Sequence, residues 1–268
     1  MSDGQITLIL QADDYGACPA ITDGILACHA AGVVTQASVI VPGPDAARGM
    51  WLARRAGLPL GAHLTLFCEW ELHRWYPLTT ADSLRAADGA FVAGLDELRA
   101  QAHLPDVWTE LRAQVAAAGA AGVALTHVES HVRVFDAGLL ARLSAETGLP
   151  CRDAVEPPGT GLPVDSVWHL SVQPTATKTE ALLAYVAAVP AGRHMIVAHP
   201  ADDTADLTRL CRPTSRRWKW AREIRVSDSA ALLDPRFRQL CHDRRIRLAS
   251  LADLADPGVL DGATDPVG

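Results

Sequence analysis

Short apolar runs that alternate with helix-like segments constrain the fold of this chain most strongly. The first run, ITLILQA at residues 6–12, is short and contains β-branched residues, as expected of a strand buried on both faces. A segment with apolar residues at helical spacing follows over 20–31, and this order recurs along the chain. Further strand-like runs lie at 37–41, 58–66, 124–129, 149–153, 167–172, 194–198 and 246–251. We therefore predict an α/β fold with about eight mainly parallel strands, closed or nearly closed into a distorted (β/α) barrel.

Length and composition fit one large domain. The chain has 268 residues, at the upper end of the single-domain range, where α/β barrels are common. It is 49% hydrophobic and 21% charged, which is typical of a globule with a sizeable core. We predict one domain over 1–254, with an inserted loop or lid at about 67–107. The remaining segment, 255–268, is predicted to be a flexible tail.

Charge and cysteine usage exclude several classes of protein. A net charge of −7 gives no general attraction to nucleic acid or to an anionic membrane. The basic stretch over 209–225 is accordingly interpreted as a solvated helix face or as the rim of a site for an acidic substrate. The six cysteines contain no C-x-x-C pair, which predicts reduced thiols rather than a disulfide framework. The polar start MSDGQ predicts no signal peptide, and no apolar run approaches the roughly 20 residues of a membrane-spanning helix, so we expect a cytoplasmic protein.

Polar side chains cluster at the ends of several predicted strands. They are Asp13, Asp14, His63, Glu129, His131 and His199. In a parallel barrel, the working residues gather at the carboxyl ends of the strands. Each residue also has an ordinary explanation, such as a helix cap or turn for the aspartates and a core or turn position for the histidines. Together, one Asp and two His form a ligand set that suits a divalent ion and leaves positions open for water and substrate.

Two further residues of this set suit proton transfer. If a metal holds the charge of one aspartate, the neighbouring carboxylate is free to act as a base. His199 precedes Pro200, which restrains it to an extended backbone. Because the unperturbed pKa of histidine lies near neutrality, His199 is a candidate general acid.

The predicted insertion carries aromatic and acidic residues. Trp70, Trp75 and Tyr76 form either a platform for a sugar face or a small core beneath the lid. Glu69 either binds a sugar hydroxyl or is a solvated surface carboxylate. We take Glu69, Trp70 and Trp75 as candidate substrate-binding residues.

Four segments in order, ADDYG, GAHLTL, THVESH and AHPADD, resemble the signature blocks of the YdjC/ChbG-like carbohydrate deacetylases. The resemblance extends over nearly the whole chain. It implies a barrel-like fold and metal-dependent hydrolysis of N-acetyl groups on amino sugars. It also implies site roles: the metal ligands are Asp14, His63 and His131, the catalytic base is Asp13, and the histidine near the leaving group is His199.

The chain departs from the pattern of that family at three positions. Where many relatives read His-x-Asp-Ser-His-x-His, this chain has Glu129 and Arg133. The longer Glu129 can still orient a metal-bound histidine from outside the ligand set. Arg133 becomes a candidate substrate-binding residue, since a guanidinium favours carboxylate or phosphate groups. Ala201 replaces the usual glycine after His-Pro, so a chitobiose-type substrate is not assumed.

We therefore predict a hydrolase that holds one divalent metal ion, zinc or magnesium, and removes an N-acetyl group from an amino sugar or acetylated oligosaccharide. The alternatives are a non-catalytic sugar-binding barrel and a metal-dependent hydrolase of another small amide or of a phosphoester. The expected partner is a small acetylated sugar, with neither nucleic acid nor membrane. The oligomeric state stays open, with a homodimer among the options.

Overall fold

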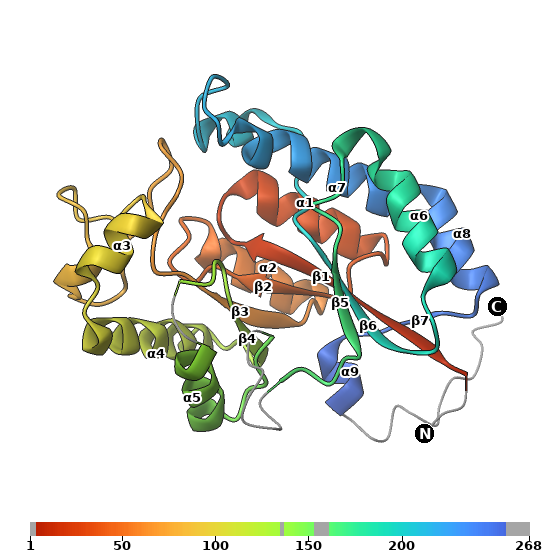
Figure 1. Ribbon diagram of the computed structural model, residues 1–268, viewed down its shortest axis with the longest axis horizontal. Coiled ribbons are helices and arrows are strands. Elements are labelled where there is room, and N and C mark those ends of the chain that lie inside the picture. Colours follow the sequence, from red (N-terminus) through yellow and green to blue (C-terminus); the bar gives the residue numbers. More distant parts are fainter. Residues whose placement is uncertain (1–3, 135–136, 153–160, 256–268) are drawn as a thin grey trace.

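One curled sheet of parallel strands organises the molecule (Figure 1). The structure is a computed structural model that describes residues 4–134, 137–152 and 161–255. Within these ranges the strands are β1 (Ile6–Tyr15), β2 (Gln36–Val39), β3 (Leu60–Leu64), β4 (Leu125–Ser130), β5 (Ser166–His169), β6 (Gly192–Ala198) and β7 (Arg247–Leu248). Their order is β4-β3-β2-β1-β6-β5, and the short β7 pairs with β1. The predicted α/β fold with a mainly parallel sheet is confirmed, as a half-barrel.

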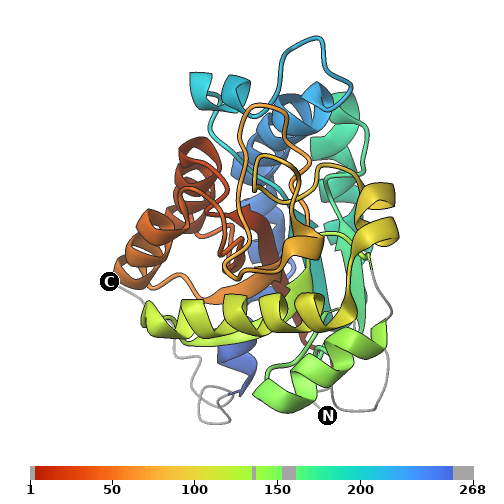
Figure 2. The same ribbon diagram turned by 90° about the vertical axis from the view of Figure 1, so that its left-hand side faces the viewer.

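Helices surround this sheet, and Figure 2 shows the long helix α4 lying across one side. They are α1 (Pro19–Ala30), α2 (Ala46–Ala56), α3 (Leu95–Gln101), α4 (Leu104–Ala120), α5 (Ala137–Thr147), α6 (Lys178–Ala188), α7 (Ile224–Leu233), α8 (Pro235–Asp243) and α9 (Leu251–Ala255). Helices α1, α2 and α4 pack on β1, β2 and β3, in the order expected of successive βα units. No helix in the described ranges is both long and apolar enough to cross a membrane.

Strand β1 lies at the centre of the sheet, and all of its residues are buried. Its side chains alternate between the two faces, as in any strand. Leu8 and Leu10 join the main core, whereas Ile9 packs with Met195 and with Leu251 of α9 in a second cluster. Burial on both faces explains why β1 is a continuous apolar run.

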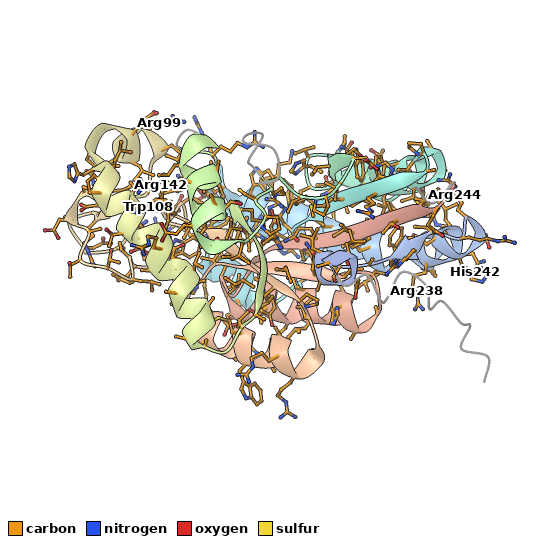
Figure 3. The ribbon with its side chains drawn as sticks, turned by 90° about the horizontal axis from the view of Figure 1, so that it is seen from below. Arg99, Trp108, Arg142, Arg238, His242 and Arg244 are labelled. Carbon is orange, nitrogen blue, oxygen red and sulfur yellow. The ribbon has the colours of Figure 1, made fainter. Side chains whose placement is uncertain are left out.

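Helices α4 and α5 also pack against each other at the outer surface. The guanidinium carbon of Arg142 lies 4.1 Å from the ring centroid of Trp108 (Figure 3). This cation–π contact fixes the two helices beside the β3–β4 edge of the sheet.

The predicted strand at 149–153 is present only as isolated bridges. Cys151 pairs with Val128 of β4 and with Gly161. The segment 67–107, predicted to be an insertion, contains only the short 3-10 turn Asp82–Leu84 and α3 before α4 begins. Its role as a lid stays a prediction. Of the predicted tail, residues 256–268 lie outside the described part of the chain.

Candidate metal centre and active site

The polar residues of the sequence motifs meet at the carboxyl ends of β1, β3, β4 and β6. Asp13 and Asp14 lie near the end of β1, and Asp14 has a left-handed backbone with φ of 69°. That conformation is uncommon for a residue with a side chain and is often found at functional sites. It interrupts the alternation of the strand, so that both carboxylates reach the same end of the sheet.

Three ligand-type atoms face one another at this end. Asp14 Oδ1 lies 3.1 Å from His63 Nε2 and 3.0 Å from His131 Nδ1. The two nitrogens are 3.2 Å apart. Atoms that bind one ion at about 2.0–2.2 Å stand about 2.8–3.6 Å from each other in octahedral or tetrahedral geometry, so the triangle has the size of a coordination face.

Outer carboxylates fix the orientation of both imidazoles. Glu129 Oε1 lies 2.9 Å from His63 Nδ1, and Glu69 Oε1 lies 3.0 Å from His131 Nε2. When these nitrogens carry the protons, the other nitrogen of each ring presents a lone pair to Asp14. Asp14 Oδ1 is buried and accepts no hydrogen bond within the described structure. Three facing lone pairs repel unless a cation lies among them, so the donor set fits a divalent metal ion.

The pKa shifts show that this cluster attracts positive charge. Burial alone would lower the pKa of His63, but the carboxylates of Asp13, Asp14 and Glu129 raise it to about 9. The pKa of His131 is likewise raised, since Glu69 and Asp14 outweigh burial. Burial would raise the pKa of Asp14, but Arg225 and His131 hold it well below its usual range.

Asp13 lies beside this triangle and is held by Arg152. The guanidinium binds it through two contacts, Nη1 to Oδ1 at 3.0 Å and Nη2 to Oδ2 at 2.8 Å. Gln11 and Ser38 also donate to Asp13 Oδ1, at 3.1 and 3.3 Å. Asp13 Oδ2 lies 4.0 Å from His199 Nε2, so the candidate base and the candidate acid face each other.

A buried chain of polar groups binds His199 at Nδ1, on the side of the ring opposite to Asp13. Ser171 Oγ lies 2.8 Å from His199 Nδ1 and donates its proton to Asp228 Oδ2. Asp228 also accepts from the His199 backbone N–H at 2.7 Å and pairs with Lys178 Nζ at 2.5 Å. Because the Ser171 hydroxyl proton is donated to Asp228, the Ser171 oxygen accepts a hydrogen bond from His199 Nδ1–H. The other ring nitrogen, His199 Nε2, then faces Asp13 without a proton. Burial lowers the pKa of His199.

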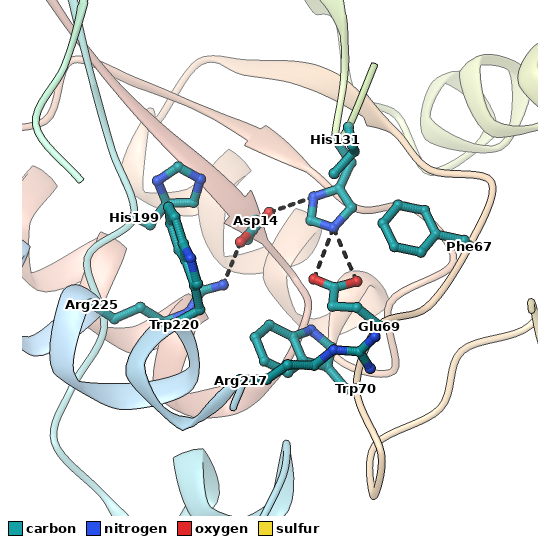
Figure 4. Close-up of a pocket in the computed structure, with 10 residues that line it drawn as sticks. Asp14, Phe67, Glu69, Trp70, His131, His199, Arg217, Trp220 and Arg225 are labelled. Carbon is teal, nitrogen blue, oxygen red and sulfur yellow. Dashed lines mark hydrogen bonds and ion pairs between the residues drawn. The ribbon is translucent and has the colours of Figure 1, made fainter. Parts of the chain in front are cut away.

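A pocket of about 280 Å³ opens beside Asp14 (Figure 4). Its walls carry three aromatic rings, two arginines and several of the groups described above. The lining residues are Asp14, Phe67, Glu69, Trp70, His131, Val132, His199, Arg217, Trp220 and Arg225. Aromatic surfaces with a few converging polar groups are typical of a binding site for a small molecule.

Among the residues predicted to bind substrate, Glu69 and Trp70 line this pocket. Trp75 lies outside its wall, fully buried, and donates from Nε1 to the backbone oxygen of Phe67 at 3.0 Å. Arg133 is exposed and also lies outside the wall. Ala201 follows the His199–Pro200 turn and packs so tightly on α1 that a Cβ at Gly24 would lie 2.5 Å from its Cα.

Several residues of the site were not among the site residues predicted from the sequence. Arg217, Trp220 and Arg225 belong to the basic stretch that was interpreted as a solvated face or a rim. Arg152 directly follows the predicted strand at 149–153, so the strand-end criterion could have included it. Asp228 lies inside a helix, and only the tertiary structure brings it to His199.

Comparisons with known proteins show which sequences this chain resembles. A family model described as YdjC-like protein matches residues 7–243. A carbohydrate deacetylase of Brevibacillus brevis is 36% identical over 128 residues, which cover 47% of this chain and 49% of that protein. A carbohydrate deacetylase of Thermus thermophilus is 38% identical over 128 residues, covering 48% and 44%. The matched region thus spans about half the length of these curated relatives.

A solved structure shares the fold over nearly its full length. It is an Enterococcus faecalis protein provisionally described as a cellobiose-phosphate cleavage protein, with a TM-score of 0.75 and 24% identity. The similarity covers 93% of this chain and 99% of that one. The family model, which matches well over half of the sequence, establishes the relationship: the chain belongs to the family of YdjC-like proteins.

Proposed function

We propose that this protein is a metal-dependent deacetylase, which removes an N-acetyl group from an amino sugar or acetylated oligosaccharide. The observation that carries the proposal is the triangle of Asp14, His63 and His131 beside the facing pair Asp13 and His199. The carbohydrate deacetylases among the relatives support the class of substrate.

The donor set defines what a bound ion contributes. A divalent ion held by Asp14, His63 and His131 would polarise an acyl carbonyl and lower the pKa of a neighbouring water molecule. Glu129 and Glu69 keep the two imidazoles in the orientation that leaves their lone pairs available. Zinc and magnesium both stay candidates for this ion.

Asp13 and His199 are the groups that move protons. Asp13 takes a proton from the attacking water, because its carboxylate is an acceptor beside the triangle and Arg152 holds it in place. Asp13 passes this proton to His199 Nε2, which faces it, and His199 delivers the proton from Nε2 to the departing nitrogen while its Nδ1 stays bound to Ser171. One water is consumed, the C–N bond breaks, and the products are acetate and a free amine.

The pocket suits a sugar ring. Trp70 and Trp220 provide flat apolar surfaces, and the polar groups at its base lie beside Asp14. The pocket is partly open, since the side chain of Trp220 is 41% exposed. This opening would let the rest of an oligosaccharide extend into solvent.

Acetate release tests the proposal. The purified protein, loaded in turn with zinc and magnesium, is incubated with a panel of N-acetylated mono- and oligosaccharides. Acetate is expected from at least one of them, with no release after chelation and much slower release from Asp13→Asn. A protein that binds the ion and a sugar but releases no acetate would instead be a sugar-binding barrel. Phosphate release from sugar phosphates would favour the phosphoester alternative.

A further inference from the structure

Arg225 has two buried hydrogen-bond donors that no described protein group satisfies. The residue is 2% exposed, and its Nε and Nη1 have no partner within the described structure. Its Nη2 binds Asp14 Oδ2 at 2.5 Å. Buried guanidinium donors left unpaired are costly, so such an arrangement points to a ligand that is absent from the protein alone.

The position of Arg225 limits which ligand this can be. Arg225 lines the pocket, and its guanidinium carbon lies 5.7 Å from the ring centroid of Trp70, another residue of the pocket wall. Asp14 Oδ2 accepts from Arg225, and Asp14 Oδ1 faces the imidazoles of His63 and His131. A substrate group that reaches Asp14 from the pocket therefore enters beside Arg225 (Figure 4).

A local irregularity of the backbone brings Arg225 to this wall. The π-helical turn Lys219–Glu223 directly precedes α7. In a regular α-helix, residues five apart, such as Trp220 and Arg225, would point about 140° away from each other. Both nevertheless line the pocket. Single π-helical turns of this kind are frequent at functional sites.

We propose that Arg225 is a catalytic residue that donates a hydrogen bond from one of its two unpaired nitrogens, Nη1 or Nε, to the acyl oxygen of the substrate and to the carboxylate released from it. This inference rests on the proposed function. When the water oxygen adds to the acyl carbon, the π electrons of the C=O bond move onto the acyl oxygen, which becomes negative. When the C–N bond breaks, this pair restores the C=O bond and the nitrogen takes the proton from His199. The hydroxyl proton left on the acid passes to Asp13, so that the acid leaves as a carboxylate. A positively charged donor stabilises this oxygen most when it is negative.

The kinetic test separates this role from substrate binding. Arg225→Met is expected to lower kcat by about 100-fold or more, the usual effect of removing a donor to a developing oxyanion, with KM changed by less than about threefold. Arg225→Lys keeps the positive charge near Asp14 but loses the fork of donors, so it should retain bound metal and still lose about tenfold or more in kcat. Arg222→Met is the matched control. Arg222 lies one turn earlier, is 41% exposed and pairs with Asp203, so its loss should leave kcat and metal content unchanged.

A binding measurement tests the same residue without turnover. Acetate is titrated into metal-loaded protein and followed by calorimetry and by the fluorescence of the pocket tryptophans. Acetate should bind wild type and Arg222→Met equally, and at least about tenfold more weakly to Arg225→Met and Arg225→Lys. This measurement remains decisive if wild-type protein hydrolyses nothing in the panel, in which case the proposed function fails by itself.

Three results would overturn the assignment. Unchanged acetate affinity in both variants would show that neither Nη1 nor Nε binds the carboxylate. Loss of metal in Arg225→Lys would show that the residue only holds Asp14. A raised KM with normal kcat would place Arg225 against a permanently anionic part of the substrate. If Arg225→Met does not fold, as judged by circular dichroism, the kcat, metal content and acetate affinity of Arg225→Lys alone test the assignment.

Discussion

Glu129 binds the His63 ring on the side opposite to Asp14, with 2.9 Å between Oε1 and Nδ1. Glu69 does the same for His131, at 3.0 Å from Nε2. Each imidazole is thus held between an outer carboxylate and Asp14. This arrangement makes the outer carboxylates part of the proposed metal site, although they do not face its centre.

Glu129→Gln should weaken metal binding. The amide has no negative charge to support the proton on His63 Nδ1, and it can also turn its NH₂ group toward that nitrogen. We expect a loss of about 10- to 100-fold in metal affinity, measured by competition with a chelator. Glu146→Gln, at a surface position of α5 that pairs with Arg112, is the control and should bind metal normally. Equal affinities in the two variants would contradict the orienting role.

Glu69→Gln distinguishes two roles for a residue that lines the pocket. If Glu69 chiefly orients His131, the variant should lose about 10-fold or more in metal affinity, with a proportionate loss of activity at limiting metal. If it chiefly binds a sugar hydroxyl, KM should rise while metal affinity stays normal. We expect the first outcome. A chelator titration, which reports metal affinity, and a measurement of KM distinguish the two roles.

Asp13→Asn should retain bound metal and lose most turnover. The amide cannot accept a proton from water, and general bases contribute about 10²- to 10⁴-fold to rate. Metal content by elemental analysis and kcat on any substrate found in the panel provide the test. Full activity in this variant would refute the assignment of Asp13 as the base.

Ser171→Ala and Asp228→Asn separate the orientation of His199 from the stability of the fold. Ser171→Ala removes the acceptor of Nδ1–H and should lower kcat by about 10- to 100-fold, part of the usual contribution of a general acid. NMR of the ring nitrogens should show a mixture of His199 tautomers, with the signal assigned by its loss in His199→Gln. An unchanged tautomer would contradict the proposed positioning.

In Asp228→Asn, Lys178 loses its charged partner in a site where both side chains are almost fully buried. The free energy of unfolding should fall by about 3–5 kcal/mol, measured by urea denaturation. Ser171→Ala leaves that ion pair intact and serves as the control, with a much smaller loss expected.

The thiols should be unreactive in the folded protein. All six cysteines are buried, and burial raises the pKa of Cys18, Cys68 and Cys241 to about 11 and that of Cys28 to about 12. At pH 8 these groups stay protonated, so a disulfide reagent should react slowly with native protein and rapidly after unfolding in urea. The free energy of unfolding should also fall as the pH rises above about 9, because the thiols of the unfolded chain ionise first. Fast reaction of native protein would contradict the burial.

The sequence predicted those parts of the molecule that depend on local pattern. Apolar runs identified β1, β3 and β6, because a strand buried on both faces leaves a continuous signature. The criterion of polar residues at strand ends then collected Asp14, His63 and His131, which the structure brings within hydrogen-bonding distance. The predicted strand at 149–153 reached only isolated bridges, since its pairing depends on neighbours that the sequence does not reveal.

The site residues that lie in helices could not be predicted from a pattern of this kind. Arg225 and Asp228 lie in α7, and their charged side chains are typical of an exposed helix face. Both are nevertheless almost fully buried, because Asp14 and Lys178 neutralise them. Partners so far apart in the chain become visible only once the tertiary structure is known.

Arg152 joins the two halves of the site, since its Nη2 lies 2.8 Å from Asp13 Oδ2 and its Nη1 2.8 Å from Glu129 Oε2. One side chain therefore neutralises both the proposed base, Asp13, and an outer carboxylate of the proposed metal site, Glu129. When either carboxylate is replaced, Arg152 can bind the remaining one more closely. The losses in activity and in metal affinity caused by Asp13 and Glu129 substitutions should therefore not add in a double mutant. The proposed proton transfer and the proposed ion binding are therefore coupled through this one guanidinium.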